Sequence, residues 1–432
     1  MILPVQPPSI GDAALFKFET LIDSPAAIKL RAMTSLRSEL NSHLVNRHPP
    51  SDVQNACVDY INDLLALAEV SKTVPFKRKY TIRWRSGLTP EVVVEPSEEK
   101  TSTQAIGIDV TMTLFVYACS LLEQAAQRFV VDSRSGEILT TGLDEVAKIC
   151  SKASTAFQTC RDTLTTMTAA IPELDPRVLG GLCSYSHLCG QICAFELAAN
   201  RSGSKNLLAK LAMQVDADAR PVQQTLKGSD GLGHLINHVT VIGPMYRARA
   251  NTLMASAEFE VEHFGVANAW ADRAMSAVKE TEAALQQVTV PHMRLTVETI
   301  VSKVKVECEK IIKENRMVYF EPPPKEMPSI VPVSAIKRTP PGVPVRELLQ
   351  LYKTPVPFTP EEFVLHRPNV SMSSSGDSVS DKSIQQLSST SETLPPVQIF
   401  PNASSAAMYA SANGNSHSGH PTTGAVQTTP TR

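Results

Sequence analysis

The sequence has few aromatic residues, little net charge and no motif of a known catalytic site. Phe, Trp and Tyr make up 5% of the 432 residues, and the formal net charge is −2. A charge this close to zero gives no global reason to bind nucleic acid, so we expect no nucleic-acid partner. No nucleophile elbow, Walker loop or dinucleotide fingerprint is found. We therefore expect no catalytic residues and no cofactor; the alternative, an enzyme built from distant residues, predicts a deep polar pocket.

The sequence also lacks a recognisable secretion or membrane signal. Its first residues, MILPVQPPSIGDAALF, have no basic start followed by an apolar block. The longest apolar run, VTMTLFVYACSLL, is shorter than the roughly 20 residues that span a bilayer. We therefore expect a cytoplasmic protein without a membrane span. Its eight cysteines are then expected to be reduced thiols.

Three of these cysteines and a histidine lie in CSYSHLCGQIC, residues 183–193. Each helical residue advances about 100° around the axis, so Cys183 and His187 share one face while Cys189 and Cys193 share another. Ligands that point away from each other cannot hold one metal ion, and no second motif completes a site. We interpret the stretch as a helix-packing surface, with a metal site as the alternative.

A second histidine pair, His234 and His238, has the spacing of half a metal site. No third ligand is visible, so core or surface histidines are favoured. The surrounding stretch, GSDGLGHLINH, has the wrong glycine spacing for a dinucleotide site and predicts a loop that opens a helix. The sequence therefore predicts no metal ligand.

Helical periodicity dominates the first 366 residues. One stripe follows a cap at Ser51 or Asp52 and consists of Val53, Cys57, Ile61, Leu64 and Ala68. The segment DVTMTLFVYACSLLEQAAQRF is apolar almost all round and predicts a buried central helix. The stretch from Tyr246 and the following HFGVANAWADRAM predict a hairpin of tetratricopeptide type. A last helix buries Val297, Ile300, Val304, Cys308 and Ile311.

One more helix is predicted to begin at Pro176, with Asp175 as its cap. Glycines at positions 180, 181 and 190 lie inside it. Each glycine costs about 1 kcal/mol against alanine in a helix interior. We therefore expect the backbone of another segment to approach this helix closely.

The stretch YTIRWR alternates apolar and polar residues, which is the periodicity of a β-strand. It belongs to a basic segment that contains Lys77, Arg78, Lys79, Arg83 and Arg85. Two interpretations remain. The charges attract acidic lipid or an acidic partner, which would give peripheral contact with acidic membranes, or they protect an exposed edge strand from unwanted pairing. We favour the second.

The composition changes after about residue 366. From residue 371 on, 22 of the 62 residues are Ser or Thr, and only Phe400 and Tyr409 are aromatic. So few apolar anchors cannot offset the entropy that ordering would cost. We therefore predict a domain at residues 1–366 and a disordered, Ser/Thr-rich tail at residues 367–432.

The helix ending in KENRMVYF and the proline-bearing segment EPPPKEMPSIVPVSAIK resemble the end of the BRO-one domain of ALIX-like and Brox-like ESCRT adaptors. YTIRWRSGL is similar to that family's tryptophan hairpin. GLDEVAKICSKASTAF, QICAFELAANRSGSKNLLAKLAMQ and HFGVANAWADRA are similar to its later helices, in the same order. The resemblance covers residues 1–366. It implies an elongated, boomerang-shaped, mostly α-helical domain with a tetratricopeptide-like core and a small β-hairpin or sheet near the N-terminus.

The resemblance also implies a non-enzymatic adaptor that binds the C-terminal amphipathic helix of an ESCRT-III subunit in a shallow apolar groove, in endosomal sorting and membrane remodelling. Leu207 and Leu211 match aliphatic groove positions, for which ordinary core residues are the alternative. Lys210 beside them suits a ligand helix with an acidic face. Ala194 replaces an aromatic contact residue, so the alternative is a scaffold of the same fold that has lost ESCRT-III binding and binds another protein. Tyr319 matches a tyrosine of the end motif and has a regulatory or structural role; the protein is expected to be cytoplasmic and endosome-associated.

Overall fold

The computed structural model describes residues 2–351 except residues 12–15, 23–26, 82, 91, 95–100, 164–170, 202 and 339–340. The long helices are α1 (Ala27–Val45), α2 (Pro50–Thr73), α3 (Ser102–Arg128), α4 (Leu143–Thr163), α5 (Pro176–Asn200), α6 (Lys205–Leu226), α7 (Gly233–Glu260), α8 (Phe264–Leu285) and α9 (Pro291–Glu314). The short helical elements are η1 (Phe18–Thr20), η3 (Pro172–Leu174), the π-helical η4 (Asn315–Tyr319) and α10 (Val345–Leu348). The predicted disordered tail lies outside the described residues, so it and the boundary at residue 366 stay predictions.

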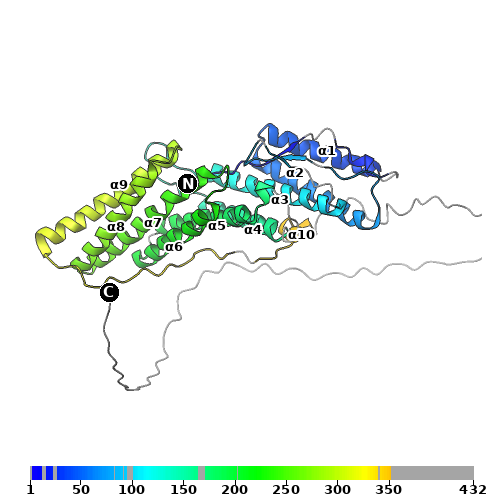
Figure 1. Cartoon of the computed structure of the whole chain (residues 1–432). Helices are drawn as coiled ribbons and strands as arrows, with labels where there is room; N and C mark the ends of the chain where they lie inside the picture. The colour runs from blue at the N-terminus through cyan, green and yellow to red at the C-terminus, as the bar shows by residue number, and fades with distance from the viewer. Residues whose placement is uncertain are drawn as a thin grey trace, which may run out of the picture. The chain divides into compact units, whose positions relative to one another are not determined.

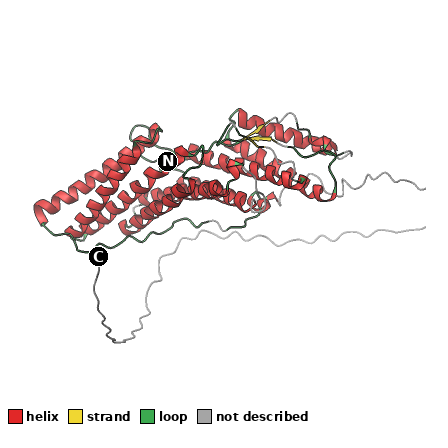
Figure 2. Cartoon of the chain, in the orientation of Figure 1, coloured by secondary structure: helices red, strands yellow, loops and turns green. Residues whose placement is uncertain are grey.

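Each long helix packs against the helix before it and the helix after it, from α1 to α9 (Figure 1). Short connections join α6, α7, α8 and α9, which makes these neighbours antiparallel. Strands occur only in a small element beside α1 and α2 within the described residues (Figure 2). The prediction of a mostly helical fold with a small sheet near the N-terminus is confirmed.

Helix α3 is the buried central helix that its composition predicts. It packs between α2 and α4, and most of its residues from Ala105 to Leu122 are buried. Its length and apolar composition would allow it to cross a membrane, but nearly all of its most apolar stretch is covered by the fold. The helix has 27 residues, so the apolar run alone underestimated the length available to span a bilayer. Its N-terminus is set by a capping box between Thr101 and Gln104.

The predicted hairpin of tetratricopeptide type corresponds to α7 and α8, which pack along each other. Tyr246 on α7 and Trp270 on α8 are both buried, as their spacing predicts. Val261 is an exception, because α7 ends at Glu260 and leaves this side chain exposed at the corner. The stripe predicted for the last helix lies on α9 and faces the hydrophobic core of the domain. Ile300 is only partly buried.

The sheet has three antiparallel strands in the order β1 (Ser9–Gly11), β2 (Arg83–Arg85) and β3 (Val93–Val94). Trp84 pairs with Ile10 on one side and with Val94 on the other, and its ring is buried while Arg83 and Arg85 are exposed. The predicted alternation is therefore confirmed over Arg83–Arg85, while Ile82 lies outside the described residues. The proposed edge position is wrong, because β1 covers one side of β2 and β3 covers the other.

A buried carboxylate joins the sheet region to the first three helices. One oxygen of Asp109 accepts hydrogen bonds from the hydroxyls of Tyr60 (2.6 Å) and Tyr80 (2.9 Å). The other accepts from the indole N–H of Trp84 at 2.7 Å. The Arg37 guanidinium lies 3.5 Å from the same carboxylate, and both charged side chains are buried. Four segments of the chain are thus held by one polar centre, and burial raises the pKa of both tyrosines.

Helix starts and internal glycines show where sequence patterns succeed and fail. Asp175 caps α5 as predicted, because its side chain accepts the Arg177 N–H. Helix α2 instead begins at Pro50, a residue whose fixed φ suits the first helical position, so the predicted cap at Ser51 or Asp52 is wrong. The α5 glycines face side chains first, not another backbone: an added Cβ at Gly181 would lie 2.2 Å from Leu226, and one at position 190 would meet Ile336.

After η4 the chain returns along the helices in an extended conformation, and we call residues 321–338 the strap. Figure 1 shows it running from the end of α9 toward α10. The Arg273 guanidinium of α8 donates to the Pro328 carbonyl at 3.2 Å. Farther along, the Arg338 guanidinium donates to Asp218 of α6 at 3.0 Å. The strap therefore lies on helices far from it in sequence.

Candidate functional site

The first turns of α6 carry three of the predicted site residues. The Ser204 side chain caps the helix by accepting the Leu207 N–H at 3.3 Å. Leu207 is 46% exposed, and Lys210 is also exposed. Leu211, one turn after Leu207, is 8% exposed and belongs to the hydrophobic core. The helix therefore brings the three residues together but opens only Leu207 and Lys210 to solvent.

Ala194 lies on the neighbouring helix α5 and is half-buried. The next residue, Phe195, is buried and makes an edge contact with Tyr246 at 5.4 Å between ring centroids. Phe195 is therefore committed to the interior, and it does not replace an aromatic contact at position 194. At position 194 the surface of α5 therefore presents only the methyl group of Ala194 to a partner.

The strap borders this part of α5 and α6. The Val333 N–H donates to the Lys210 carbonyl at 3.2 Å, and the Ala335 N–H donates to the Gln191 side chain at 3.1 Å. Val331 and Val333 keep exposed side chains. Sequence reasoning identified the extended segment but not its return to α6, because no local pattern encodes such a distant contact. We call Leu207, Lys210, Val331 and Val333 the α6 face.

A buried carboxylate, Asp218, lies farther along α6 and is paired with an exposed arginine. Asp218 is paired with Arg338 of the strap at 3.0 Å, and its second oxygen is 3.8 Å from Nε2 of His187 on α5. Burial lowers the pKa of His187, and this effect outweighs the attraction of the Asp218 carboxylate. His187 is therefore held mainly neutral near pH 7, and Arg338 supplies the counterion to Asp218.

The cysteines of residues 183–193 serve packing, as predicted. Cys189 and Cys193 are buried in the core, and burial raises the pKa of each thiol to about 12. Cys183 is half-buried, with its sulfur 3.4 Å from the Ser154 hydroxyl. No group of three or more His, Cys, Asp or Glu side chains is placed to hold a metal ion in the part of the chain that the structure describes.

The second histidine pair also divides between core and surface. His238 is buried, with Nδ1 3.3 Å from the Tyr185 hydroxyl, whereas His234 is exposed. The same hydroxyl accepts the Leu3 N–H at 2.8 Å, so it ties the N-terminal segment to α5 and α7. Burial lowers the pKa of His238 to about 3. The imidazole is thus a neutral packing group.

Tyr319 lies in η4, in contact with α8. Its ring is parallel to that of Phe264 with centroids 3.4 Å apart, and the side chain is 43% exposed. The turn is completed by Asn315, which accepts the Glu321 N–H and donates to the Glu321 carbonyl. Tyr319 thus contacts α8 at the end of α9, and none of its contacts reaches the α6 face.

The arrangement of the α6 face suits recognition and offers no reacting group. It consists of an exposed leucine, an exposed lysine and two exposed valines of the strap, which reaches α6 at the Lys210 carbonyl. Such a surface fits an amphipathic segment with apolar and acidic side chains.

Comparisons with known proteins agree with the architecture. A family model described as the BRO1-like domain matches residues 22–360. The solved complex of ALIX BRO1 with CHMP4C is 18% identical, with a TM-score of 0.63 over 80% of this chain and 96% of that chain. A crystal structure of ALIX with the SIVmac239 PYKEVTEDL late domain is 17% identical, with a TM-score of 0.65 over 80% and 50%.

A third structure, described as the basis for endosomal targeting by the Bro1 domain, is 15% identical. Its TM-score is 0.63, over 84% of this chain and 98% of that chain. At these identities the likeness establishes the fold. No curated protein sequence matches the chain significantly.

Proposed function

The chain belongs to the BRO1-like domain family, and from this premise we propose that it is a non-enzymatic adaptor for an ESCRT-III subunit. The C-terminal amphipathic helix of that subunit would dock on the α6 face. The likeness to the ALIX BRO1 complex with CHMP4C supports this class of partner. The exposure of Leu207 is the observation that carries the proposal.

An exposed leucine beside an exposed lysine gives the docking helix an apolar anchor and a charge to align with. Leu207 would lose its remaining exposure in the complex, and burying apolar area contributes about 25 cal/mol per Å² before the costs of association. Lys210 would steer an acidic helix face and would add more to the association rate than to the affinity. Val331 and Val333 of the strap would widen the apolar contact. Leu211 would support Leu207 from below.

A peptide that covers the C-terminal helix of CHMP4C tests the proposal with wild type and Leu207→Asp. We expect the variant to bind about tenfold more weakly or worse, because a carboxylate would be buried against the apolar helix face. Val306→Asp is the matched control, since Val306 is also exposed but lies on α9. Equal affinity of wild type and Leu207→Asp would exclude this face. Leu211→Asp is less informative, because it would place a charge in the core.

A second candidate is a scaffold of the same fold that has lost ESCRT-III binding and binds another protein. Ala194 favours it, because the groove lacks a large anchor at a position where a small interface would concentrate its binding energy. The burial of Leu211 points the same way, since it leaves one leucine where two were expected. This alternative would be supported if the folded wild-type protein shows no measurable binding of the CHMP4C peptide.

We further propose that the adaptor acts in the cytoplasm and at endosomes, in endosomal sorting or membrane remodelling. The exposed side chains of Arg83 and Arg85 are the candidates for peripheral contact with acidic membranes. Binding to vesicles with and without phosphatidylserine would measure this contact. If a double Arg83→Gln, Arg85→Gln variant binds the vesicles like wild type, these two arginines do not contribute to membrane contact.

A further inference from the structure

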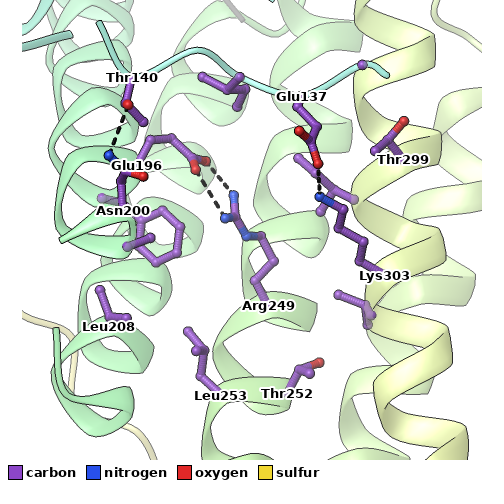
Figure 3. A pocket seen from close by; sticks show the side chains of 16 residues that line it. Glu137, Thr140, Glu196, Asn200, Leu208, Arg249, Thr252, Leu253, Thr299 and Lys303 are labelled. Carbon is purple, nitrogen blue, oxygen red and sulfur yellow. Dashed lines mark hydrogen bonds and ion pairs between the residues drawn. The ribbon is translucent and has the colours of Figure 1, made fainter. Parts of the chain in front are cut away.

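A cavity of about 410 Å³ is lined by residues of α5, α6, α7 and α9, none of which belongs to the α6 face. Figure 3 shows it from close by, with Arg249 near its centre and Leu208 and Leu253 on one side. The loop after α3 closes another side through Glu137 and Thr140 (Figure 3). The volume is in the range of sites that hold small organic molecules.

The walls of this cavity combine apolar and polar side chains. The apolar lining residues are Ile138, Phe195, Ala199, Leu208, Leu253, Ile300 and Val304. The polar ones are Glu137, Thr140, Glu196, Asn200, Arg249, Thr252, Thr299 and Lys303. A ligand with an apolar body and a polar group would match both kinds of wall.

The charged residues of the cavity neutralise one another. Glu196 and Arg249 form a bidentate ion pair, and Glu137 pairs with Lys303 across the opposite side (Figure 3). Two acids and two bases leave no net charge to attract an ion. A charged ligand would lose hydration and gain no unpaired counterion, so the electrostatics favour an uncharged ligand.

Arg249 supplies a polar recognition point. It lies on α7. Its guanidinium carbon lies 4.4 Å from the centroid of the Phe195 ring and 5.1 Å from that of the Tyr246 ring. Its bonds to Glu196 use the two terminal nitrogens, whereas a guanidinium has five N–H donors. The side chain keeps 19% exposure at a residue that lines the cavity. A further hydrogen bond joins Arg249 to Tyr246, and the remaining N–H groups are the candidate donors to a ligand acceptor.

The loop beside the cavity contacts the helices through polar groups and through Ile138, which packs against the hydrophobic core. The Thr299 hydroxyl donates to the Ser135 carbonyl at 2.8 Å, and the Asn200 amide donates to the Thr140 hydroxyl at 3.1 Å. Gly136 takes a positive φ of 70°, and an added Cβ would lie 2.6 Å from the Thr299 hydroxyl. The close approach of this loop to α9 therefore requires glycine at this position.

We infer that this cavity binds a compact, uncharged, largely apolar molecule that carries a carbonyl or similar hydrogen-bond acceptor. The apolar body lies against Leu253 and Ile300, and the acceptor takes an N–H of Arg249. The inference does not depend on the proposed ESCRT-III partner, because the residues of the cavity are not those of the α6 face.

Prodan, an uncharged naphthalene ketone whose emission shifts to the blue in apolar surroundings, is the probe for the test. With the full chain we expect a saturable blue shift with one molecule bound per chain. Leu253→Trp on α7 and Ile300→Trp on α9 fill the cavity from two different helices and should each weaken binding by about tenfold or more. Val261→Trp, just beyond the C-terminal end of the helix that carries Leu253, is the matched control, because Val261 is exposed and does not line the cavity.

Thermal unfolding of each variant shows whether it is folded, and if one cavity variant does not fold, the other decides. The anionic probe anilinonaphthalene sulfonate should bind this site about tenfold more weakly than prodan, since no unpaired cation awaits it. The inference is overturned if prodan gives no saturable shift or if both folded cavity variants bind it like wild type. Equal binding of the anionic probe at the same site would overturn the assignment of an uncharged ligand.

Discussion

The polar centre at Asp109 and the α6 face place polar and apolar side chains in opposite surroundings. At Asp109, two tyrosines, a tryptophan and an arginine are buried around one carboxylate. On α6, a leucine and a lysine remain open to solvent. The first region satisfies its polar groups within the chain, whereas the second leaves apolar and charged groups for another molecule.

The difference shows why burial cannot be judged from residue type alone. Arg37 and Asp109 are charged but buried, because each compensates the other and hydrogen bonds satisfy the carboxylate. Leu207 is apolar but exposed, and Leu211 on the same helix is buried. Loss of an internal partner should therefore affect stability at Asp109, while changes on the α6 face should affect binding. The following predictions test that division.

The largest expected effect is on stability at the polar centre. Asp109→Asn should lower the free energy of unfolding by about 3–5 kcal/mol, because Arg37 would lose its buried counterion. Urea denaturation followed by circular dichroism measures the change. Asp144→Asn is the control: Asp144 is exposed on α4, 3.9 Å from Lys148, and its loss should stay within about 0.5 kcal/mol. Equal losses in both variants would contradict the role given to the polar centre.

Leucine truncation should separate core from surface within α6. Leu211→Ala should cost about 2–5 kcal/mol of stability by leaving a cavity. Leu207→Ala should cost less than about 0.5 kcal/mol and should instead weaken binding of the CHMP4C peptide. The same urea titrations and a peptide-binding assay measure both effects. A stable Leu211→Ala variant with weakened binding would place Leu211 on the open face after all.

A buried histidine should make the interior sensitive to acid. The pKa of His238 is about 3 in the folded chain, below its usual value of about 6.5. As the pH falls below about 6.5, the unfolded chain takes up a proton that the folded chain does not. Stability should therefore fall by about 1.4 kcal/mol per pH unit from this group until the pH approaches 3.

His238→Gln should remove this contribution and flatten the pH dependence of unfolding between pH 6 and 4. His187 also has a lowered pKa and adds a slope of the same sign in both proteins, so the difference between them isolates His238. Exposed His234→Gln is the control and should follow wild type. Parallel curves for wild type and His238→Gln would show that the imidazole is not held neutral.

The smallest expected effect is a gain on the α6 side. Ala194→Phe restores a large aromatic contact beside the α6 face and should tighten binding of the CHMP4C peptide about fivefold, or roughly 1 kcal/mol. Isothermal titration calorimetry measures the affinity. Ala68→Phe on α2, at another half-buried alanine, should leave it unchanged. Weaker binding by Ala194→Phe would mean that the partner helix approaches α5 too closely for a ring.

Local patterns predicted the helices and several of their faces. The periodic stripe of α9, the buried length of α3 and the cap at Asp175 follow from side-chain spacing and from chemistry within one turn of helix. The alternation around Trp84 predicted β2 for the same reason. The central position of β2 was missed, because its partner β1 lies more than 70 residues earlier in the chain.

The candidate site depended more strongly on contacts between distant segments. The spacing of Leu207 and Leu211 places them on one side of α6, but their different exposure depends on what packs there. The strap reaches Lys210 from more than 120 residues away, and its course decides which side chains stay open. The cavity at Arg249 likewise arises where α5, α7, α9 and a loop meet.

By itself the sequence determined a chain of amphipathic helices, one helix that is apolar almost all round and a short basic strand, because the repeat of apolar residues selects local backbone structure. Only the tertiary structure decided that Asp109 is shared by four segments, that Leu211 is buried while Leu207 is open, and that the strap returns to α6. Exposure depends on every segment that packs against a residue, and those segments are neighbours in space rather than in sequence.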